Sequence, residues 1–292
     1  MKPRLLGLSA SLVFVISATA FGQQEPGNPQ LGSSGQVGQR EKNTPARPAP
    51  RRPDGRVHLG PPPGETGLWL PFNGGSERLV NPDKMTLETS AQYPDRPKLS
   101  EVPFQPWARE VHRDRSSNQL EPHTRCKPSG GPRQFLTPYG VEFVEMPELQ
   151  RIFIMDLGGP HTYRIIYMDG RPHPEHLAPS YYGHSIGRWE GDTLVVDTRG
   201  FTEGFWFDRS GLPHTERLRM IERFTRTDSK TIKYEVTIDD PGAYTRTWSA
   251  GFLLGWDPQA DLFEYVCQDN NIAPDLMVGG REAAGRTSLF VP

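Results

Sequence analysis

This sequence contains few cysteines and no excess of either charge. Its 292 residues include 2 cysteines, 33 lysines and arginines, and 35 aspartates and glutamates, which gives a net charge of −2. Two cysteines are too few for a cysteine-rich zinc site or an iron–sulfur cluster. The balanced charge, without a basic stripe, argues against a nucleic-acid backbone as partner. We therefore predict that the partner is a small-molecule ligand or substrate, and that no nucleic acid is bound.

The sequence also lacks the short motifs of several enzyme and cofactor classes. It contains no Walker phosphate loop, no G-x-G-x-x-G after a strand pattern and no H-E-x-x-H. These motifs cradle phosphates or hold zinc on one helix face. We predict no cofactor. Beyond the N-terminus, no apolar run reaches the length of a membrane-spanning helix, so no membrane span is expected after signal cleavage.

The N-terminus has the pattern of an export signal. Lys2 and Arg4 precede an apolar stretch, and Ala18-Thr19-Ala20 offers a small-residue cleavage site. We predict a signal peptide over 1–20 and an exported protein, periplasmic or extracellular; a retained membrane anchor is the alternative. Residues 21–63 are rich in Gln, Gly, Pro and Arg with few large apolar side chains, which predicts a disordered linker.

The two cysteines, Cys126 and Cys267, form an even set in a chain that we expect to be exported. Disulfides persist in the oxidising compartments outside the cytoplasm, and an even count favours pairing. We predict one disulfide between them, with two unpaired thiols as the alternative.

The later part of the chain alternates between apolar and polar residues with a period of two. The alternation is clearest where Ile232, Tyr234, Val236 and Ile238 share one face, as expected of a strand with one buried and one wet side. About eight such segments follow one another, joined by turn residues and without helical patterns between them. This arrangement predicts an all-β fold.

These segments predict a single β-rich domain over 64–292. Consecutive hairpins favour an antiparallel up-and-down barrel, which has no exposed sheet edge, and we assign it to 132–292; a β-sandwich is the alternative. Residues 64–131 lack a regular pattern and are predicted to wrap around the barrel, with one helix beginning near Pro106. A barrel of this size is just wide enough to hold one small ligand.

A long motif, YGHSIGRWEGDTLVVDT, occupies residues 182–198. Together with CKPSGGPR at 126–133 and RIIYMDGR at 164–171, it resembles the core motif of a large group of uncharacterised secreted proteins of soil and other environmental bacteria. The resemblance implies export and implies no particular activity. The strand spacing is also similar to that of lipocalin-like barrels, an analogy of fold that carries little information about function.

Three residues are candidates for acid–base chemistry. His184 lies at the mouth of a strand, where an imidazole can accept or donate a proton near neutral pH. Glu222 falls on the apolar face of its strand, so its carboxylate must be protonated or paired; Arg246 is the predicted partner. His214 lies in a Gly/Pro-containing loop close to Asp208, and loops of this kind often carry function. A purely structural role is the alternative for each.

Residues on the predicted inner faces favour a binding function. We predict that they line an internal cavity for a small apolar or aromatic molecule, with ordinary core packing as the alternative. The predicted ligand-binding residues are Arg164, Tyr182, Trp189, Trp206, Tyr234, Tyr244, Arg246 and Trp248.

The densest group of nitrogen and oxygen donors is formed by His173, His176 and His184, with Glu175. Zinc takes such ligands, but His173 and His176 lie in a Pro-broken loop and not on a helix face. We therefore predict no metal, with these three histidines as weak candidate ligands.

Binding of a small molecule inside an exported barrel is thus the function that the sequence favours. One alternative is an enzyme, a hydrolase, isomerase or lyase, that uses His184 as acid or base on a small molecule. The other is a non-catalytic interaction domain of the cell envelope. The sequence leaves the oligomeric state open.

Overall fold

The computed structural model describes residues 46–62, 64–71, 78–84, 96–119, 121–158, 160–264 and 267. The predicted signal peptide and much of the predicted linker lie outside these residues. The described chain forms nine strands, one α-helix and four short 3₁₀ turns. The strands are β1 (Leu68–Pro71), β2 (Val141–Met146), β3 (Arg151–Asp156), β4 (Tyr163–Tyr167), β5 (His184–Glu190), β6 (Thr193–Arg199), β7 (Arg219–Asp228), β8 (Thr231–Asp239) and β9 (Trp248–Asp257).

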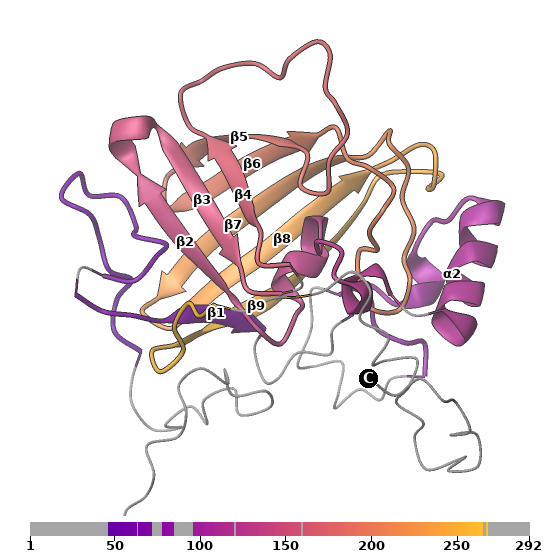
Figure 1. Cartoon of the computed structure of the whole chain (residues 1–292), viewed down its shortest axis with the longest axis horizontal. Helices are drawn as coiled ribbons and strands as arrows, with labels where there is room; N and C mark the ends of the chain where they lie inside the picture. Colours follow the sequence, from indigo (N-terminus) through magenta and orange to yellow (C-terminus); the bar gives the residue numbers. More distant parts are fainter. Residues whose placement is uncertain are drawn as a thin grey trace, which may run out of the picture.

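The nine strands close into one barrel in which each strand lies beside its neighbour in sequence (Figure 1). β9 pairs with β8 on one side and with β1 on the other, so the described strands form a continuous ring. The predicted all-β barrel is confirmed.

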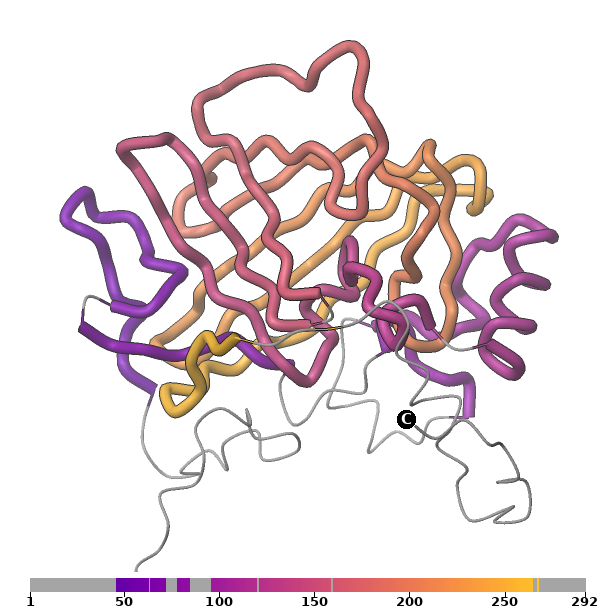
Figure 2. Tube along the Cα trace, viewed as in Figure 1, coloured from indigo at the N-terminus to yellow at the C-terminus, as the bar shows by residue number. Residues whose placement is uncertain are grey.

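One pair of strands departs from the predicted antiparallel arrangement. β4 and β5 are parallel and pair at two positions, Ile166 with Ser185 and Tyr167 with Ile186. The chain between them, 168–183, forms the long loop at the top of Figure 2 before β5 begins. Antiparallel strands can be joined by a tight turn, whereas a parallel pair needs a crossover of this length. The barrel is therefore mixed.

Alternating burial in the longest strands follows the predicted pattern. Ile232, Tyr234, Val236 and Ile238 of β8 are at most 1% exposed. In the neighbouring strand β7, every second residue from Met220 to Arg226 is also buried. Because side chains of a strand alternate between its faces, these two strands supply much of the barrel interior.

Part of the predicted linker is ordered against the barrel. We call residues 46–62 the N-terminal arm. Val57 and Leu59 are at most 1% exposed within the core. The Leu59 amide donates a hydrogen bond to Glu145 Oε1 (2.7 Å), and Trp69 Nε1 donates one to the Leu59 carbonyl (2.7 Å). The polar composition predicted that this segment would stay disordered, because ordering a chain costs conformational entropy. The two buried apolar side chains and these long-range hydrogen bonds offset that cost.

The barrel also begins earlier than predicted, because Leu68–Pro71, in the expected irregular segment, forms β1 and pairs with β9 along its whole length. The predicted helix is present as α2 (Pro106–Asn118), with proline in its first turn, where a missing amide hydrogen costs nothing. It lies outside the barrel (Figure 1). Among the described residues, no helix has the length and apolarity needed to cross a bilayer.

A short turn of the chain fills the barrel from one end. The 3₁₀ turn η4 (Gly131–Phe135) carries Phe135, whose ring centroid lies 5.3 Å from that of Phe224 and 4.9 Å from that of Tyr234. A Cβ at Gly130 would collide with the Tyr181 carbonyl oxygen, so this turn needs glycine to pass so close. Side chains of the protein itself therefore occupy this part of the interior.

The predicted disulfide is confirmed. Cys126 and Cys267 are bonded, with their Cα atoms 5.6 Å apart. The bond ties the residue that follows η3 (Pro122–Arg125) to a position beyond β9.

Candidate functional site

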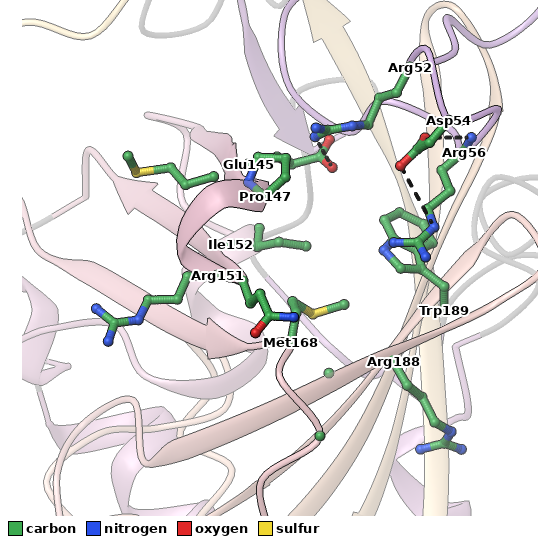
Figure 3. Close-up of a pocket in the computed structure, with 14 residues that line it drawn as sticks. Arg52, Asp54, Arg56, Glu145, Pro147, Arg151, Ile152, Met168, Arg188 and Trp189 are labelled. Carbon is green, nitrogen blue, oxygen red and sulfur yellow. Dashed lines mark hydrogen bonds and ion pairs between the residues drawn. The ribbon is translucent and has the colours of Figure 1, made fainter.

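A pocket of about 410 Å³ opens in the barrel wall beyond the end of β4 (Figure 3). There β5 continues after its two pairs with β4, and the N-terminal arm contributes part of the rim. The pocket is lined by Arg52, Asp54, Arg56, Glu145, Met146, Pro147, Gln150, Arg151, Ile152, Met168, Gly170, Gly187, Arg188 and Trp189.

The floor of this pocket is apolar. Ile152 is 3% exposed and belongs to the core, and Met168 and Trp189 pack against the same core. A Cβ at Gly187 would lie too close to Met168 Sδ and to Ile166 Cγ2 (2.7 Å). Glycine at this position therefore lets Met168 lie across β5 and form the floor.

The rim carries charges of both signs. Arg52 Nη1 donates a hydrogen bond to Glu145 Oε2 at 3.0 Å, so the charge of Arg52 is neutralised. Figure 3 shows the guanidinium groups of Arg151 and Arg188 directed away from the pocket. Arg188 donates to Glu190 (2.6 Å), and the Arg151 guanidinium lies 5.5 Å from the centre of the Tyr167 ring.

Arg56 differs from the other three arginines of the pocket. Its Nε lies 3.9 Å from Asp54 Oδ2, which is beyond hydrogen-bond distance, and its side chain is 58% exposed. The exposed guanidinium of Arg56 is therefore open to a further anionic partner at this rim.

Long-range contacts of the arm hold this rim in place. Arg51 donates two hydrogen bonds to Asp192, in the turn between β5 and β6, at 2.9 and 2.6 Å, and the pairing lowers the pKa of Asp192. Arg226 Nη1 donates to the carbonyl oxygens of His58 (2.6 Å) and Gly60 (3.1 Å). The arm is thus fixed at both sides of the segment that carries Arg52 and Arg56.

The barrel interior contains a closed polar network around Arg164. Its guanidinium donates to Ser185 Oγ (2.9 Å), Thr198 Oγ1 (2.7 Å) and both carboxylate oxygens of Glu222. The Tyr234 hydroxyl donates to Glu222 Oε1 at 3.0 Å. All five side chains are at most 2% exposed. Burial alone would lower the pKa of Arg164, but the Glu222 carboxylate outweighs it and raises that pKa.

Glu222 is therefore paired, as its place on an apolar face required, but its partner is Arg164. The predicted partner, Arg246, is exposed in a bend before β9. β9 begins only at Trp248, so the strand alternation that placed Arg246 on the inner face does not extend to this residue.

His184 lies on the outer side of the barrel wall. Its neighbour Ser185 points inward to Arg164, and consecutive strand residues point to opposite faces. The His184 ring stacks on Tyr167 with centroids 5.0 Å apart, and its Nδ1 lies 2.9 Å from His173 Nδ1. Burial, and then His173, lower the pKa of His184. The wall thus separates His184 from Glu222.

The three candidate metal ligands are brought together only in part. His173 lies beside His184, with its Nε2 3.6 Å from Asp197 Oδ1, whereas His176 and Glu175 are exposed. Within the described ranges, no three His, Cys, Asp or Glu side chains are grouped so that they would hold a metal ion.

His214 is a buried residue of the loop before β7. Its ring lies between those of Phe205 and Phe207, with centroids 4.1 and 5.0 Å away, and its Nε2 lies 3.1 Å from the Phe205 carbonyl oxygen. Burial lowers the pKa of His214 to about 4. Asp208 accepts hydrogen bonds from the amide and hydroxyl of Ser210. These contacts give both residues structural partners.

The remaining predicted aromatics pack away from the pocket. Trp206 lies 5.1 Å from the Arg115 guanidinium. The Tyr244 hydroxyl donates to the Pro213 carbonyl (2.7 Å), and the Tyr244 ring lies 5.3 Å from that of Trp248. Of the eight predicted ligand-binding residues, only Trp189 lines the 410 Å³ pocket.

Sequence reasoning missed a buried acid. Asp156 is 2% exposed and accepts hydrogen bonds from the Tyr182 hydroxyl and the Gly158 amide, both at 2.8 Å. Burial raises the pKa of Asp156 to about 7. The period-two pattern of β3 carries a signal for it, because Ile152, Ile154 and Asp156 fall on one face. Arg56, in contrast, lies in a polar segment with no such periodicity.

No protein-family model, curated protein or solved structure matches this chain.

Proposed function

We propose that this protein binds a small molecule with a flat apolar body and one anionic group in the pocket beside Trp189. The ligand class is the small apolar or aromatic molecule that the sequence predicts, with a negative charge added. The site lies at the opening beyond β4 and not in the centre of the barrel. One observation carries the proposal: an apolar floor of Ile152, Met168 and Trp189 lies in the same pocket as the incompletely paired Arg56.

The size and floor of the pocket support the apolar part of the ligand. A cavity of about 410 Å³ lies within the range of small-molecule sites. Covering an apolar floor stabilises a complex by about 25 cal/mol per Å² of surface removed from water. Stacking of an aromatic ring on Trp189 would add about 0.5–1.5 kcal/mol.

The charges of the rim support the anionic part. Arg52 is neutralised by Glu145, whereas Arg56 lacks a hydrogen-bonded carboxylate partner for its guanidinium among the described residues. Guanidinium groups present a planar fork that matches a carboxylate. A carboxylate or sulfonate on the ligand would therefore face Arg56 while its ring covers the floor.

Export is part of the proposal. The N-terminal pattern predicts a cleaved signal, and the Cys126–Cys267 bond supports an oxidising compartment, where disulfides persist. A ligand taken up there would come from the periplasm or the surroundings of the cell.

Calorimetric titration of the mature protein with naphthalene-2-carboxylate and with its neutral carboxamide tests the proposal. We expect saturable one-to-one binding, with the carboxylate bound about tenfold more tightly, a difference of about 1.4 kcal/mol. Arg56→Gln should reduce the carboxylate affinity to that of the amide, and Trp189→Ala should weaken both.

Arg217→Gln is the matched control, because Arg217 is exposed and lies outside this pocket. The variant should bind both compounds as the parent protein does. The absence of saturable binding, or affinities that Trp189→Ala leaves unchanged, would refute the assignment of the site.

A further inference from the structure

A second pocket, of about 280 Å³, lies outside the barrel at the C-terminal end of α2. Its walls come from α2, the turn η3 and the loop around Ser210. All of its lining residues are polar: Arg78, Arg115, Ser116, Gln119, Glu121, Thr124, Arg209 and Ser210. It has no apolar floor, so its chemistry differs from that of the pocket beside Trp189.

The lining of this second pocket is rich in arginine. It contains three arginines and a single carboxylate, that of Glu121. Glu121 already accepts two hydrogen bonds from Arg133, at 2.9 and 2.7 Å, and the side chains of this pair are at most 6% exposed. The charge of Glu121 is thus neutralised by Arg133, which does not line the pocket. In the described part of the chain, neither Arg78 nor Arg115 forms an ion pair.

Arg115 is the most confined of the three arginines. Its guanidinium lies 5.1 Å from the centre of the Trp206 ring, its Nη1 is buried, and that atom has no hydrogen-bond partner among the described residues. Burial lowers the pKa of Arg115. A guanidinium held partly out of water without a carboxylate costs free energy, and an anion beside it would offset that cost.

The end of α2 opposes an anion only slightly. A helix C-terminus carries the equivalent of about −0.5 elementary charge, whereas Arg78 and Arg115, which form no ion pair among the described residues, carry two full positive charges. The balance therefore favours a negative ligand, and the size and polarity of the pocket favour a compact one.

We propose that this pocket binds a compact oxyanion, either inorganic phosphate or the phosphate group of a small ester, through Arg78 and Arg115. Phosphate suits the site because its oxygens accept paired hydrogen bonds from guanidinium groups. The proposal shares no residue with the pocket beside Trp189 and stands independently of the function proposed for it.

The test is a calorimetric titration of the mature protein with sodium phosphate, at an ionic strength held constant with sodium chloride. We expect saturable binding that Arg78→Gln and Arg115→Gln each weaken about tenfold or more. Arg113→Gln is the matched control, because Arg113 lies on the same helix, is 75% exposed and pairs with Glu110. It should leave the phosphate affinity unchanged.

A parallel titration with glycerol phosphate separates the two sources of the anion. Tighter binding of the ester would indicate that its organic part also contacts the pocket, and equal binding would indicate that the oxyanion is sufficient. If Arg115→Gln loses its fold by circular dichroism, Arg78→Gln decides the result.

Two outcomes would overturn the proposal. One is phosphate binding that is not saturable, or that Arg113→Gln weakens as much as Arg78→Gln does. The other is phosphate binding that responds to Arg56→Gln but not to Arg78→Gln, which would place the anion in the pocket beside Trp189. A failure of the naphthalene compounds to bind would leave the phosphate result unaffected.

Discussion

The guanidinium of Arg164 donates hydrogen bonds to both carboxylate oxygens of Glu222 at the centre of the barrel, where the two side chains are at most 1% exposed. Each charge is compensated only by the other and by neighbouring hydroxyl groups. The stability of the fold should therefore depend strongly on both side chains of this pair.

Removal of either partner should be strongly destabilising. Glu222→Met or Arg164→Met would leave one buried charge unpaired, and we expect each to lower the free energy of unfolding by about 3–5 kcal/mol. The double variant Arg164→Met/Glu222→Met should lose much less than the sum of the two. Urea unfolding of the three variants measures this coupling, and additive losses would contradict it.

Asp156 should make stability decrease as the pH rises. Its pKa is raised from the ordinary value of 3.8 to about 7, so the folded protein favours the neutral acid. The stability that the neutral Asp156 side chain contributes is fully present below pH 3.8, and it is lost as the pH rises toward 7. Relative to the parent, Asp156→Asn should gain stability across this window, by up to roughly 4 kcal/mol.

The measurement is urea unfolding of both proteins at pH 4, 5.5 and 7. Glu148→Gln, at an exposed position, serves as the control and should show no such trend. A stability difference between Asp156→Asn and the parent that stays constant with pH would show that Asp156 does not titrate in this range.

His214 should make stability decrease as the pH falls, which is the opposite of the effect of Asp156. Burial lowers its pKa from 6.5 to about 4, so the unfolded chain takes up the proton first as the pH falls. The stability from the neutral ring is present above pH 6.5 and is lost between 6.5 and 4. His214→Gln, which retains a donor for the Phe205 carbonyl, should remove roughly 3 kcal/mol of this acid sensitivity.

Thermal or urea unfolding of His214→Gln between pH 7 and 4 checks this expectation. His176→Gln is a fitting comparison, since His176 is exposed and should leave the acid sensitivity unchanged. Equal acid sensitivity in all three proteins would contradict the assignment.

The disulfide should contribute strongly to stability. Cys126 and Cys267 are 141 residues apart, and in the chain-entropy model a closed loop of that length stabilises the fold by about 5 kcal/mol. The double variant Cys126→Ser/Cys267→Ser should therefore unfold at much lower urea concentration. Urea unfolding in the presence and absence of reductant measures the same difference in the parent protein.

Intact-mass spectrometry of the protein from an exporting host tests the predicted export. We expect loss of residues 1–20, or of a few more, together with a mass two hydrogens below that of the reduced chain. An uncleaved N-terminus would contradict the predicted signal peptide.

The strands and their inner faces were predictable because they depend on local periodicity. A strand buries every second residue, so Ile232, Tyr234 and Val236 were assigned correctly without knowledge of their partners. The parallel pairing of β4 and β5 was not predictable, because it depends on the path of residues 168–183. The order of the N-terminal arm likewise depends on contacts between Leu59, Glu145 and Trp69, which are distant in sequence.

The pocket likewise contains one residue that the sequence indicated and one that it did not. Trp189 was identified from the sequence as a candidate ligand-binding residue, since it stands out as an aromatic on a strand. Arg56 was not identified, because nothing in a polar, proline-rich segment indicates that the segment packs against the barrel.

The sequence by itself determined that the fold is all-β, that Glu222 lies on the apolar face of its strand, and which two cysteines were available to pair; it favoured a barrel over a sandwich without deciding between them. Only the tertiary structure decided that Glu222 pairs with Arg164, that His184 lies on the other side of the wall, and that the pocket forms beyond β4. Periodicity is a local property of each strand, whereas these three outcomes depend on register and on which strands become neighbours, which only the closure of the barrel determines.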